Sequence, residues 1–226
     1  MIKAILKDHM GSDLSVINAA RVSFGKESHA LDWEWYDYED GRASGEYIAV
    51  LDERDTKLVK YLAKHNHISP FGHAFASFHV KAPIFVARQL VKHSFLRWNE
   101  VSRRYVDDEP EFYVPDVWRG RSADKKQGSE GVVESNANML YYNTMSLGLY
   151  KQLLDEGVAP EMARMTLPQS TMTEWWWSGS LDAFARMCNL RLPSDTQYET
   201  RVVAEQVSKV LGELFPVSWE ALVGHD

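Results

Sequence analysis

The chain of 226 residues contains a single cysteine, Cys188, and no long apolar run. One cysteine excludes an internal disulfide framework and any metal site built from cysteine alone. No segment approaches the roughly 18 consecutive apolar residues that a membrane-spanning helix needs. The segment 1–15 is interrupted by Asp8 and Asp13, so it does not resemble a secretory signal. We therefore expect a cytoplasmic protein without membrane contact.

Basic residues are also in deficit. The chain has 25 lysines and arginines against 32 acidic residues, which gives a formal net charge of −7. This balance argues against a protein that wraps nucleic acid, although it is compatible with a local basic patch. Apolar residues make up 45% of the chain, enough for a sizeable core, and we predict a single domain over residues 1–226. Residues 31–52 and 116–137 are polar and aperiodic and contain glycine, so we predict loop insertions there.

The apolar periodicity predicts an α+β fold whose second half is dominated by helices. Apolar and polar residues alternate over residues 73–82, which predicts a half-buried strand. Pro83 suits a first helical turn, and we predict a helix from Ile84 to Leu96. Ser194 and Gln197 form a capping-box pattern that predicts the start of a long C-terminal helix. Further helices are predicted over residues 55–66, 138–156 and 180–190, with a short one after Pro160.

One segment contradicts the acidic average. Residues 88–104 contain five basic residues and a single acid, Glu100. A basic run is usually a solvated face, but Gln89, Asn99 and Ser102 are interleaved with the cations here, and a predicted strand leads directly into the segment. The planar fork of arginine matches the oxygens of a phosphate group. The pattern therefore favours an anion site.

Two other interpretations concern residues of the same region. Arg97, Trp98, Arg103 and Arg104 could line a basic aromatic groove, which is typical of a single-stranded nucleic-acid-binding module. Several histidines suggest a metal site, but their spacing matches no pair of ligands on one face of a helix. No acidic residue stands at a spacing from them that is typical of a metal-binding motif. We predict no metal site from these residues, which are His65, His67, His73 and His79.

The basic segment also carries a family resemblance. It reads Lys92-His93-Ser94-x-x-Arg97-x-Asn99-x-x-Ser102-x-Arg104-Tyr105. This resembles the motif Arg-His-Arg-x-x-Ser-x-Asn-x-x-Ser-x-Arg-Tyr of flavin-dependent thymidylate synthases, and five of the eight specified positions match. The likeness extends over most of the chain through AARVSF at 19–24, HISPFGH at 67–73, GVAPEMARMTLP at 157–168, and NLR at 189–191 followed by Gln197 and Glu199.

The resemblance implies an α+β fold with a central antiparallel sheet, and a homotetramer that binds FAD and dUMP where subunits meet. It implies the reductive methylation of dUMP to dTMP, in which methylenetetrahydrofolate supplies the carbon, NADPH reduces the flavin and the flavin delivers hydride. If water trapped the methylene instead, the product would be a hydroxymethyl pyrimidine nucleotide, and the sequence leaves this alternative open. The other class of thymidylate synthase uses an exposed cysteine thiolate, whereas Cys188 falls on a core-facing helical stripe.

The resemblance also implies roles for individual residues. Arg191 is the implied catalytic residue, beside the uracil carbonyl and N3, where a permanent cation stabilises negative charge that develops on the ring. The residues implied in dUMP binding are Gln89, Lys92, Glu100, Ser102, Arg103, Arg104, Arg164 and Arg191. Of these, the resemblance places Gln89, Ser102, Arg104 and Arg164 mainly at the phosphate and Glu100 at the junction of nucleotide and flavin. The residues implied in FAD binding are Ser23, His67, Ser69, Lys92, His93, Ser94, Arg97, Asn99, Glu100 and Arg186.

Three motif positions depart from the family pattern. Lys92 replaces an arginine, so it keeps the charge but loses the bidentate fork. Ser94 and Arg97 stand where the family has arginine and serine. These two positions would share one face of a continuing helix, so we predict that the Arg97 guanidinium compensates for Ser94. Asp182 and Asp195 also depart from the family, since they replace an expected basic or amide residue and a common histidine.

Overall fold

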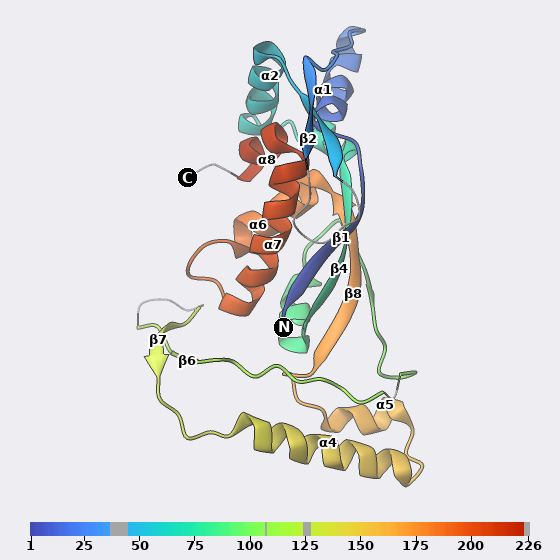
Figure 1. Ribbon diagram of the computed structural model, residues 1–226, viewed down its shortest axis with the longest axis vertical. Coiled ribbons are helices and arrows are strands. Elements are labelled where there is room, and N and C mark those ends of the chain that lie inside the picture. Colours follow the sequence, from blue (N-terminus) through green and yellow to red (C-terminus); the bar gives the residue numbers. More distant parts are fainter. Residues whose placement is uncertain (37–44, 107, 124–127, 224–226) are drawn as a thin grey trace.

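A four-stranded antiparallel sheet with the strand order β1-β4-β8-β5 forms the centre of the molecule (Figure 1). The computed structural model describes residues 1–36, 45–106, 108–123 and 128–223. The predicted α+β class and the antiparallel sheet are confirmed. The strands of the sheet are β1 (Lys3–Met10), β4 (Phe75–Pro83), β5 (Leu96–Glu100) and β8 (Met172–Ser180).

The remaining elements follow the chain around this sheet. Two hairpins lie outside it: β2 (Asp32–Tyr36) pairs with β3 (Glu46–Val50), and β6 (Trp118–Gly120) pairs with β7 (Glu130–Val133). The helices are α1 (Asp13–Arg21), α2 (Glu53–Lys64), α3 (Ile84–Leu90), α4 (Met139–Asp155), α5 (Pro160–Ala163), α6 (Leu181–Arg191), α7 (Tyr198–Leu214) and α8 (Pro216–Val223). Short 3-10 turns are η1 (Val22–Phe24), η2 (Ser69–His73) and η3 (Arg164–Thr166).

The two faces of the sheet differ because side chains alternate along each strand. Phe78 of β4 is fully buried and pairs in register with Trp177 of β8, whereas the neighbouring Ser77 pairs with Ser178. The hydroxyl groups of these two serines lie 2.8 Å apart. We name the side with Phe78, Val80, Trp175 and Trp177 the helix-covered face, and the side with Ser77, His79, Trp176 and Ser178 the open face.

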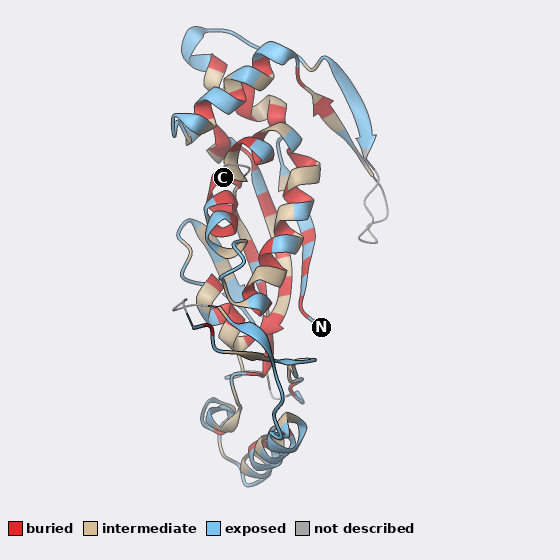
Figure 2. Cartoon of the chain, turned by 90° about the vertical axis from the view of Figure 1, so that its left-hand side faces the viewer, coloured by how far each residue is buried: buried red, intermediate tan, exposed pale blue. Residues whose placement is uncertain are grey.

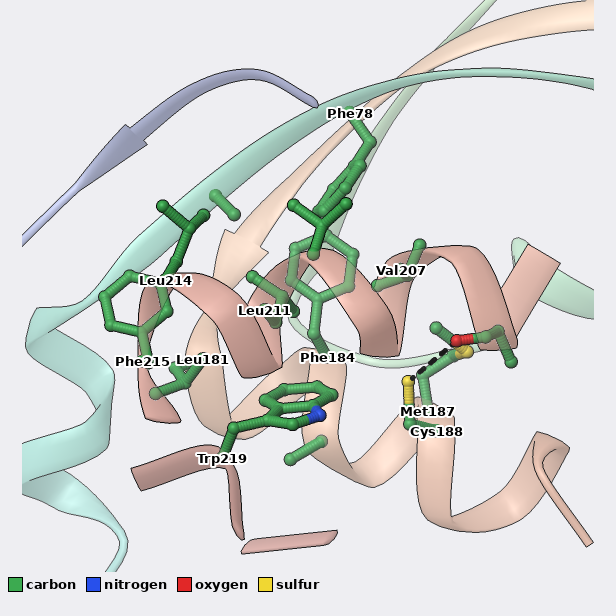
Figure 3. Packing of buried hydrophobic residues seen from close by; sticks show 14 of the residues in the cluster. Phe78, Leu181, Phe184, Met187, Cys188, Val207, Leu211, Leu214, Phe215 and Trp219 are labelled. Atoms are coloured by element: carbon green, nitrogen blue, oxygen red, sulfur yellow. Dashed lines mark hydrogen bonds between the residues drawn. The ribbon is translucent and has the colours of Figure 1, made fainter. Parts of the chain in front are cut away.

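Helices α6 and α7 pack on the helix-covered face, and α8 packs on these two helices from the side away from the sheet, which completes the core (Figures 1 and 3). The rings of Phe78 and Phe184 meet edge to face with centroids 5.4 Å apart. Leu211 of α7 is fully buried in the same cluster. Cys188 is buried between α6 and α7, where its thiol donates to the carbonyl oxygen of Ala204 at 3.7 Å, so its predicted core position is confirmed.

Helix α4 stands apart from this core and is largely exposed (Figure 2). The side chain of Asn138 caps its first turn by accepting from the backbone amide of Tyr141 at 3.0 Å. Gly157, with a φ of +83°, follows its C-terminus, as the sequence predicted. Several large apolar side chains of α4 face solvent in a single chain: Leu140, Tyr141, Tyr142, Met145 and Leu149.

The predicted helix from Ile84 to Leu96 is wrong in its second half. Helix α3 ends at Leu90, and Phe95 adopts a φ of +65°, which no helix contains. Residues 96–100, predicted as helix end and loop, form strand β5 instead. The strand forms because Leu96 and Trp98 are two residues apart, so both side chains point to the same face and pack on the core beside β8.

The predicted capping box at Ser194 is also wrong. Helix α7 begins at Tyr198, and its N-cap residue Gln197 makes no side-chain capping bond. The backbone carbonyl of Ser194 instead accepts from Arg201 at 3.1 Å. The predicted loop insertions 31–52 and 116–137 contain the β2–β3 and β6–β7 hairpins, although residues 37–44 and 124–127 lie outside the described residues. Within those described, no helix is long and apolar enough to cross a membrane.

The packing predicts a sharp difference between two leucines. Leu211→Ala removes a fully buried side chain from the core and should lower the free energy of unfolding by about 2–5 kcal/mol. Leu190→Ala, at a position that is 62% exposed on α6, should change it by less than about 1 kcal/mol. Urea unfolding followed by tryptophan fluorescence measures both, and equal losses would contradict this core.

Candidate functional site

A pocket of about 470 Å³ opens where the end of α3, the end of α6 and the start of α7 meet. Gln89, Lys92 and Arg191, three residues that the sequence implied in nucleotide binding, lie together on its wall. We name this pocket the cationic pocket. Its lining residues are Arg88, Gln89, Lys92, Gly128, Arg191 and Gln197.

Local structure explains why these side chains converge. Helix α3 buries Val86, Ala87 and Leu90, so Arg88 and Gln89 project from its other side. Arg191 is the last residue of α6, and Gln197 immediately precedes α7. The pocket is therefore built from the ends of three helices that are anchored in the core.

Gly128 completes the wall through a close backbone approach. Its φ is +80°, and a Cβ atom there would overlap the carbonyl oxygen of Asp195. Only glycine fits this position without displacing the backbone. Asp195 therefore contributes its backbone, and the change from the histidine common in the family does not affect that contact.

His93 pairs with Arg191 inside the site. The guanidinium Nε of Arg191 donates to Nε2 of His93 at 3.0 Å. Burial, together with the charge of Arg191, lowers the pKa of His93 to about 4, so the imidazole is neutral at neutral pH and can accept this bond. The two terminal nitrogens of Arg191 have no protein partner within the described part of the chain. They are free to donate to a ligand.

A second network borders the cationic pocket. The side-chain amide of Gln89 donates to the side-chain oxygen of Gln197. The amide nitrogen of Gln197 in turn donates to the buried carboxylate of Glu199 at 3.4 Å. Glu199 also accepts from the hydroxyl of Tyr113 at 3.0 Å and from the guanidinium of Arg119 on β6. This network links α3, α7 and the β6–β7 hairpin.

The residues implied in FAD binding lie mostly elsewhere. Arg97 and Asn99 pair in register with Ser178 and Trp176, so they belong to the open face of the sheet. His67 and Ser69 are exposed at η2, at the end of the sheet where β4 begins. Arg97 lies toward the same end, because Leu96 pairs with Gly179 and Phe75 with Ser180. Ser23 is exposed in η1, after helix α1.

Glu100 and the turn after it occupy the opposite end of β5. The Glu100 carboxylate accepts from the Thr173 hydroxyl at 2.8 Å and from the Trp98 indole at 3.0 Å. In the turn, the Ser102 hydroxyl accepts from Nε of Arg104 at 3.3 Å. Arg103 donates to the backbone carbonyl of Asp108. These residues are ordered by local bonds and do not line the cationic pocket.

Arg164 is remote from the pocket within one chain. It lies in η3 beside α5, where its guanidinium is exposed and donates to the backbone carbonyl of Glu161 at 3.2 Å. No hydrogen bond joins Arg104 or Arg164 to Arg191 in the part of the chain that is described, and neither of the two lines the cationic pocket. A single chain therefore does not bring the three arginines together.

The predicted exchange between Ser94 and Arg97 is wrong in its geometric premise. Helix α3 ends at Leu90, and Phe95 has a positive φ, so Ser94 lies in a turn and Arg97 on a strand, and they share no helical face. Arg186, implied in FAD binding, pairs with Asp182 at 2.9 Å and lies over the ring of Phe95. Asp182 thus holds Arg186 against the turn that carries Ser94.

The cations of the site lack acidic partners, whereas several other arginines of the protein have them. Arg21, Arg119 and Arg201 each pair with a carboxylate. Within the described residues, no carboxylate pairs with the cations of the site: Arg88, Lys92, Arg97, Arg104, Arg164 and Arg191. Arg88, Lys92 and Arg191 meet in the cationic pocket, and neighbouring cations without acidic partners are suited to bind an anion. The described residues contain no cluster of side chains suited to a metal ion.

Sequence reasoning missed part of this site. Arg88 belongs to the basic segment but is not among the implied binding residues. Its i,i+4 spacing from Lys92, which lies in the same pocket, is the signal that points to it. Gln197 was interpreted as a capping residue, although its side chain belongs to the pocket. Gly128 gave no signal, because its contact with Asp195 joins segments far apart in sequence.

Sequence comparison relates the chain to a known protein family. The family model described as "Thymidylate synthase complementing protein" matches residues 5–217. A flavin-dependent thymidylate synthase from Thermus thermophilus is 36% identical over 223 residues, covering 97% of this chain and 75% of the relative. One from Kosmotoga olearia is 38% identical over 224 residues, covering 96% of this chain and 88% of the relative.

Solved structures share the fold. The crystal structure of the UMP/dUMP methylase PolB from Streptomyces cacaoi, bound with 5-Br dUMP, superposes with a TM-score of 0.78 at 30% sequence identity. The match covers 99% of this chain and 95% of PolB. Fold and site thus define an enzyme of the methyltransferase class. The chain belongs to the flavin-dependent thymidylate synthase family, which confirms the resemblance found in its sequence.

The contact between His93 and Arg191 predicts a pH dependence of stability. The pKa of His93 is about 4 in the folded state and about 6.5 when unfolded, so the unfolded chain binds more protons between these values. The free energy of unfolding should therefore fall as the pH drops from about 6.5 to about 4, by about 1–2 kcal/mol after allowance for partial exposure.

Urea unfolding of the wild type and of His93→Gln at about pH 7 and about pH 4.5 measures this contribution. Glutamine can still accept from Arg191 but does not titrate. We expect the variant to lose less stability at the lower pH than the wild type loses. An equal loss in both proteins would show that His93 is not held neutral by this site.

Proposed function

We propose that this protein catalyses the flavin-dependent reductive methylation of dUMP to dTMP, with methylenetetrahydrofolate as carbon donor and NADPH as the source of electrons. The observation that carries the proposal is the cationic pocket, where Arg191 offers two unpartnered guanidinium nitrogens beside Lys92 and Arg88. Family membership supports the flavin dependence, and PolB, named as a UMP/dUMP methylase, supports a uridine nucleotide as the substrate.

The pocket provides the electrostatics that this substrate needs. Arg191 would face the uracil ring, because the bond from its Nε to neutral His93 fixes the orientation of the planar guanidinium and leaves both terminal nitrogens available. A fixed cation there lowers the energy of negative charge that develops on the ring carbonyl. Lys92 and Arg88 would add positive charge for the nucleotide phosphate.

The open face fits a flavin dinucleotide. Arg97 would supply an unpaired guanidinium for the diphosphate, and Asn99 presents an exposed amide on the same strand. His67 and Ser69 present an exposed imidazole and hydroxyl toward the same end of the sheet. When bound, FAD would supply the hydride that completes the methyl group. The protein would contribute orientation, charge and exclusion of water.

The implied site residues lie apart within one chain, which supports a homotetramer whose subunits share sites. The nucleotide residues Lys92 and Arg191 border a pocket between helices, while Arg97 and Asn99 lie on the open face of the sheet. Helix α4 and its neighbours, including Met162 and Met165, expose apolar side chains that a second copy would bury. We propose that Arg164 and Arg104 of one subunit reach the nucleotide held by Arg191 of another.

Three assays on the purified protein test the proposed reaction. We expect bound or added FAD to give flavin absorbance, and incubation with dUMP, methylenetetrahydrofolate and NADPH to give a product with the mass of dTMP. A product heavier by one oxygen would identify the hydroxymethyl alternative. Parallel reactions with UMP test whether the substrate range follows that named for PolB.

A colourless protein that does not bind added FAD would contradict the proposal. If such a protein also bound single-stranded DNA with a steep salt dependence, the nucleic-acid-binding module would be the correct interpretation.

Sharing of sites between subunits predicts complementation. Arg164→Ala and Arg191→Ala should each reduce dTMP formation at least about 100-fold. Co-expressed and randomly assembled, they should recover about a quarter of the wild-type rate, because some sites then receive both intact arginines. Lys92→Ala co-expressed with Arg191→Ala is the matched control, since both residues line one pocket of one chain, and we expect no recovery. Equal outcomes for the two mixtures would contradict a shared site.

A further inference from the structure

Glu199 is a buried carboxylate in the first turn of α7 and is 3% exposed. One oxygen accepts from the Tyr113 hydroxyl at 3.0 Å and from the guanidinium of Arg119. The other accepts from the amide nitrogen of Gln197 at 3.4 Å. A carboxylate can only accept hydrogen bonds, so every neighbour must turn a hydrogen toward it.

This requirement fixes the orientation of two consecutive side-chain amides. Because Nε2 of Gln197 faces Glu199, Oε1 of Gln197 faces Gln89 and accepts from its Nε2. The carbonyl oxygen of Gln89 is thereby left on the side away from Gln197. It has no hydrogen-bond partner among the described residues, and Gln89 lines the cationic pocket.

An acceptor in this pocket is chemically distinctive. The charged groups around it, on Arg88, Lys92 and Arg191, can only donate. The family resemblance implied a place for Gln89 mainly at the phosphate of dUMP. Its free carbonyl oxygen would repel the oxygens of a phosphate group, however, so this atom suits a different part of the nucleotide. The edge of a uracil ring has an N3–H donor between two carbonyl acceptors, whereas N3 of cytosine carries a lone pair.

We propose that Glu199 is a positioning residue that, through Gln197, orients the carbonyl oxygen of Gln89 toward the N3–H of a bound uracil ring and so selects uracil over cytosine nucleotides. This inference rests on the proposed function for the location of the nucleotide. Arg191 would donate to a ring carbonyl while Gln89 accepts from N3–H. A cytosine ring would set its N3 lone pair against the oxygen of Gln89.

Glu199→Gln tests the proposal, because glutamine can donate as well as accept and no longer dictates which way Gln197 points. Titration of the FAD-loaded protein with dUMP and with dCMP, followed by flavin fluorescence, gives both dissociation constants. We expect the wild type to favour dUMP, and the variant to lose about tenfold of that preference, mainly through weaker dUMP binding.

Two further variants separate positioning from general damage. Gln197→Met breaks the relay and leaves the contacts of Glu199 with Tyr113 and Arg119 in place, so it should lose the preference even if Glu199→Gln folds poorly. Glu205→Gln, on the same helix at an exposed ion pair with Arg201, is the control and should keep it. A folded Gln197→Met protein with an unchanged preference would overturn the proposal.

Binding and turnover distinguish this inference from the reaction itself. If the wild type binds dUMP with a preference that depends on Glu199 but forms no dTMP, the proposed reaction fails and the positioning role stands. If it forms dTMP while Glu199→Gln and Gln197→Met keep the wild-type preference, the positioning role fails alone. A wild type that favours dCMP would overturn the positioning role as well.

Discussion

The packing of Trp98 on Trp175 decides which side chains of strand β5 lie on the helix-covered face and which lie on the open face. Both proposed ligand sites depend on this contact. The two indoles stack with centroids 4.4 Å apart, and Trp98 also meets Trp177 edge to face. With Trp98 turned toward the core, alternation sends Arg97 and Asn99 to the open face. The turn before the strand, with Phe95 at positive φ, carries His93 back toward Arg191. One hydrophobic contact thus separates the motif into two groups of residues on two sides of the sheet.

The sequence predicted the fold class and several elements well, because their apolar patterns are local. The strand over residues 73–82 and the helix over residues 138–156 agree with β4 and α4 within a few residues. The break after Leu90 was missed because residues 84–96 are compatible with a helix, and only pairing with β8 makes residues 96–100 a strand. Long-range packing outweighed local preference there.

The site was predictable to a similar degree. Motif resemblance identified Gln89, Lys92 and Arg191, which meet in one pocket. It could not reveal the contact of His93 with Arg191, nor the side-chain role of Gln197, since both depend on how α6 and α7 end. The cations of the cationic pocket connect these observations, because they have no acidic partner among the described residues and a bound anion would balance their charge.

The most direct test of this account is a crystal structure of the protein with FAD and dUMP. The account predicts dUMP in the cationic pocket, with its ring beside Arg191 and Gln89, and the flavin diphosphate against Arg97 of a different copy of the chain. The account would be contradicted by a structure in which both ligands are bound within one chain, or in which Arg191 contacts neither of them.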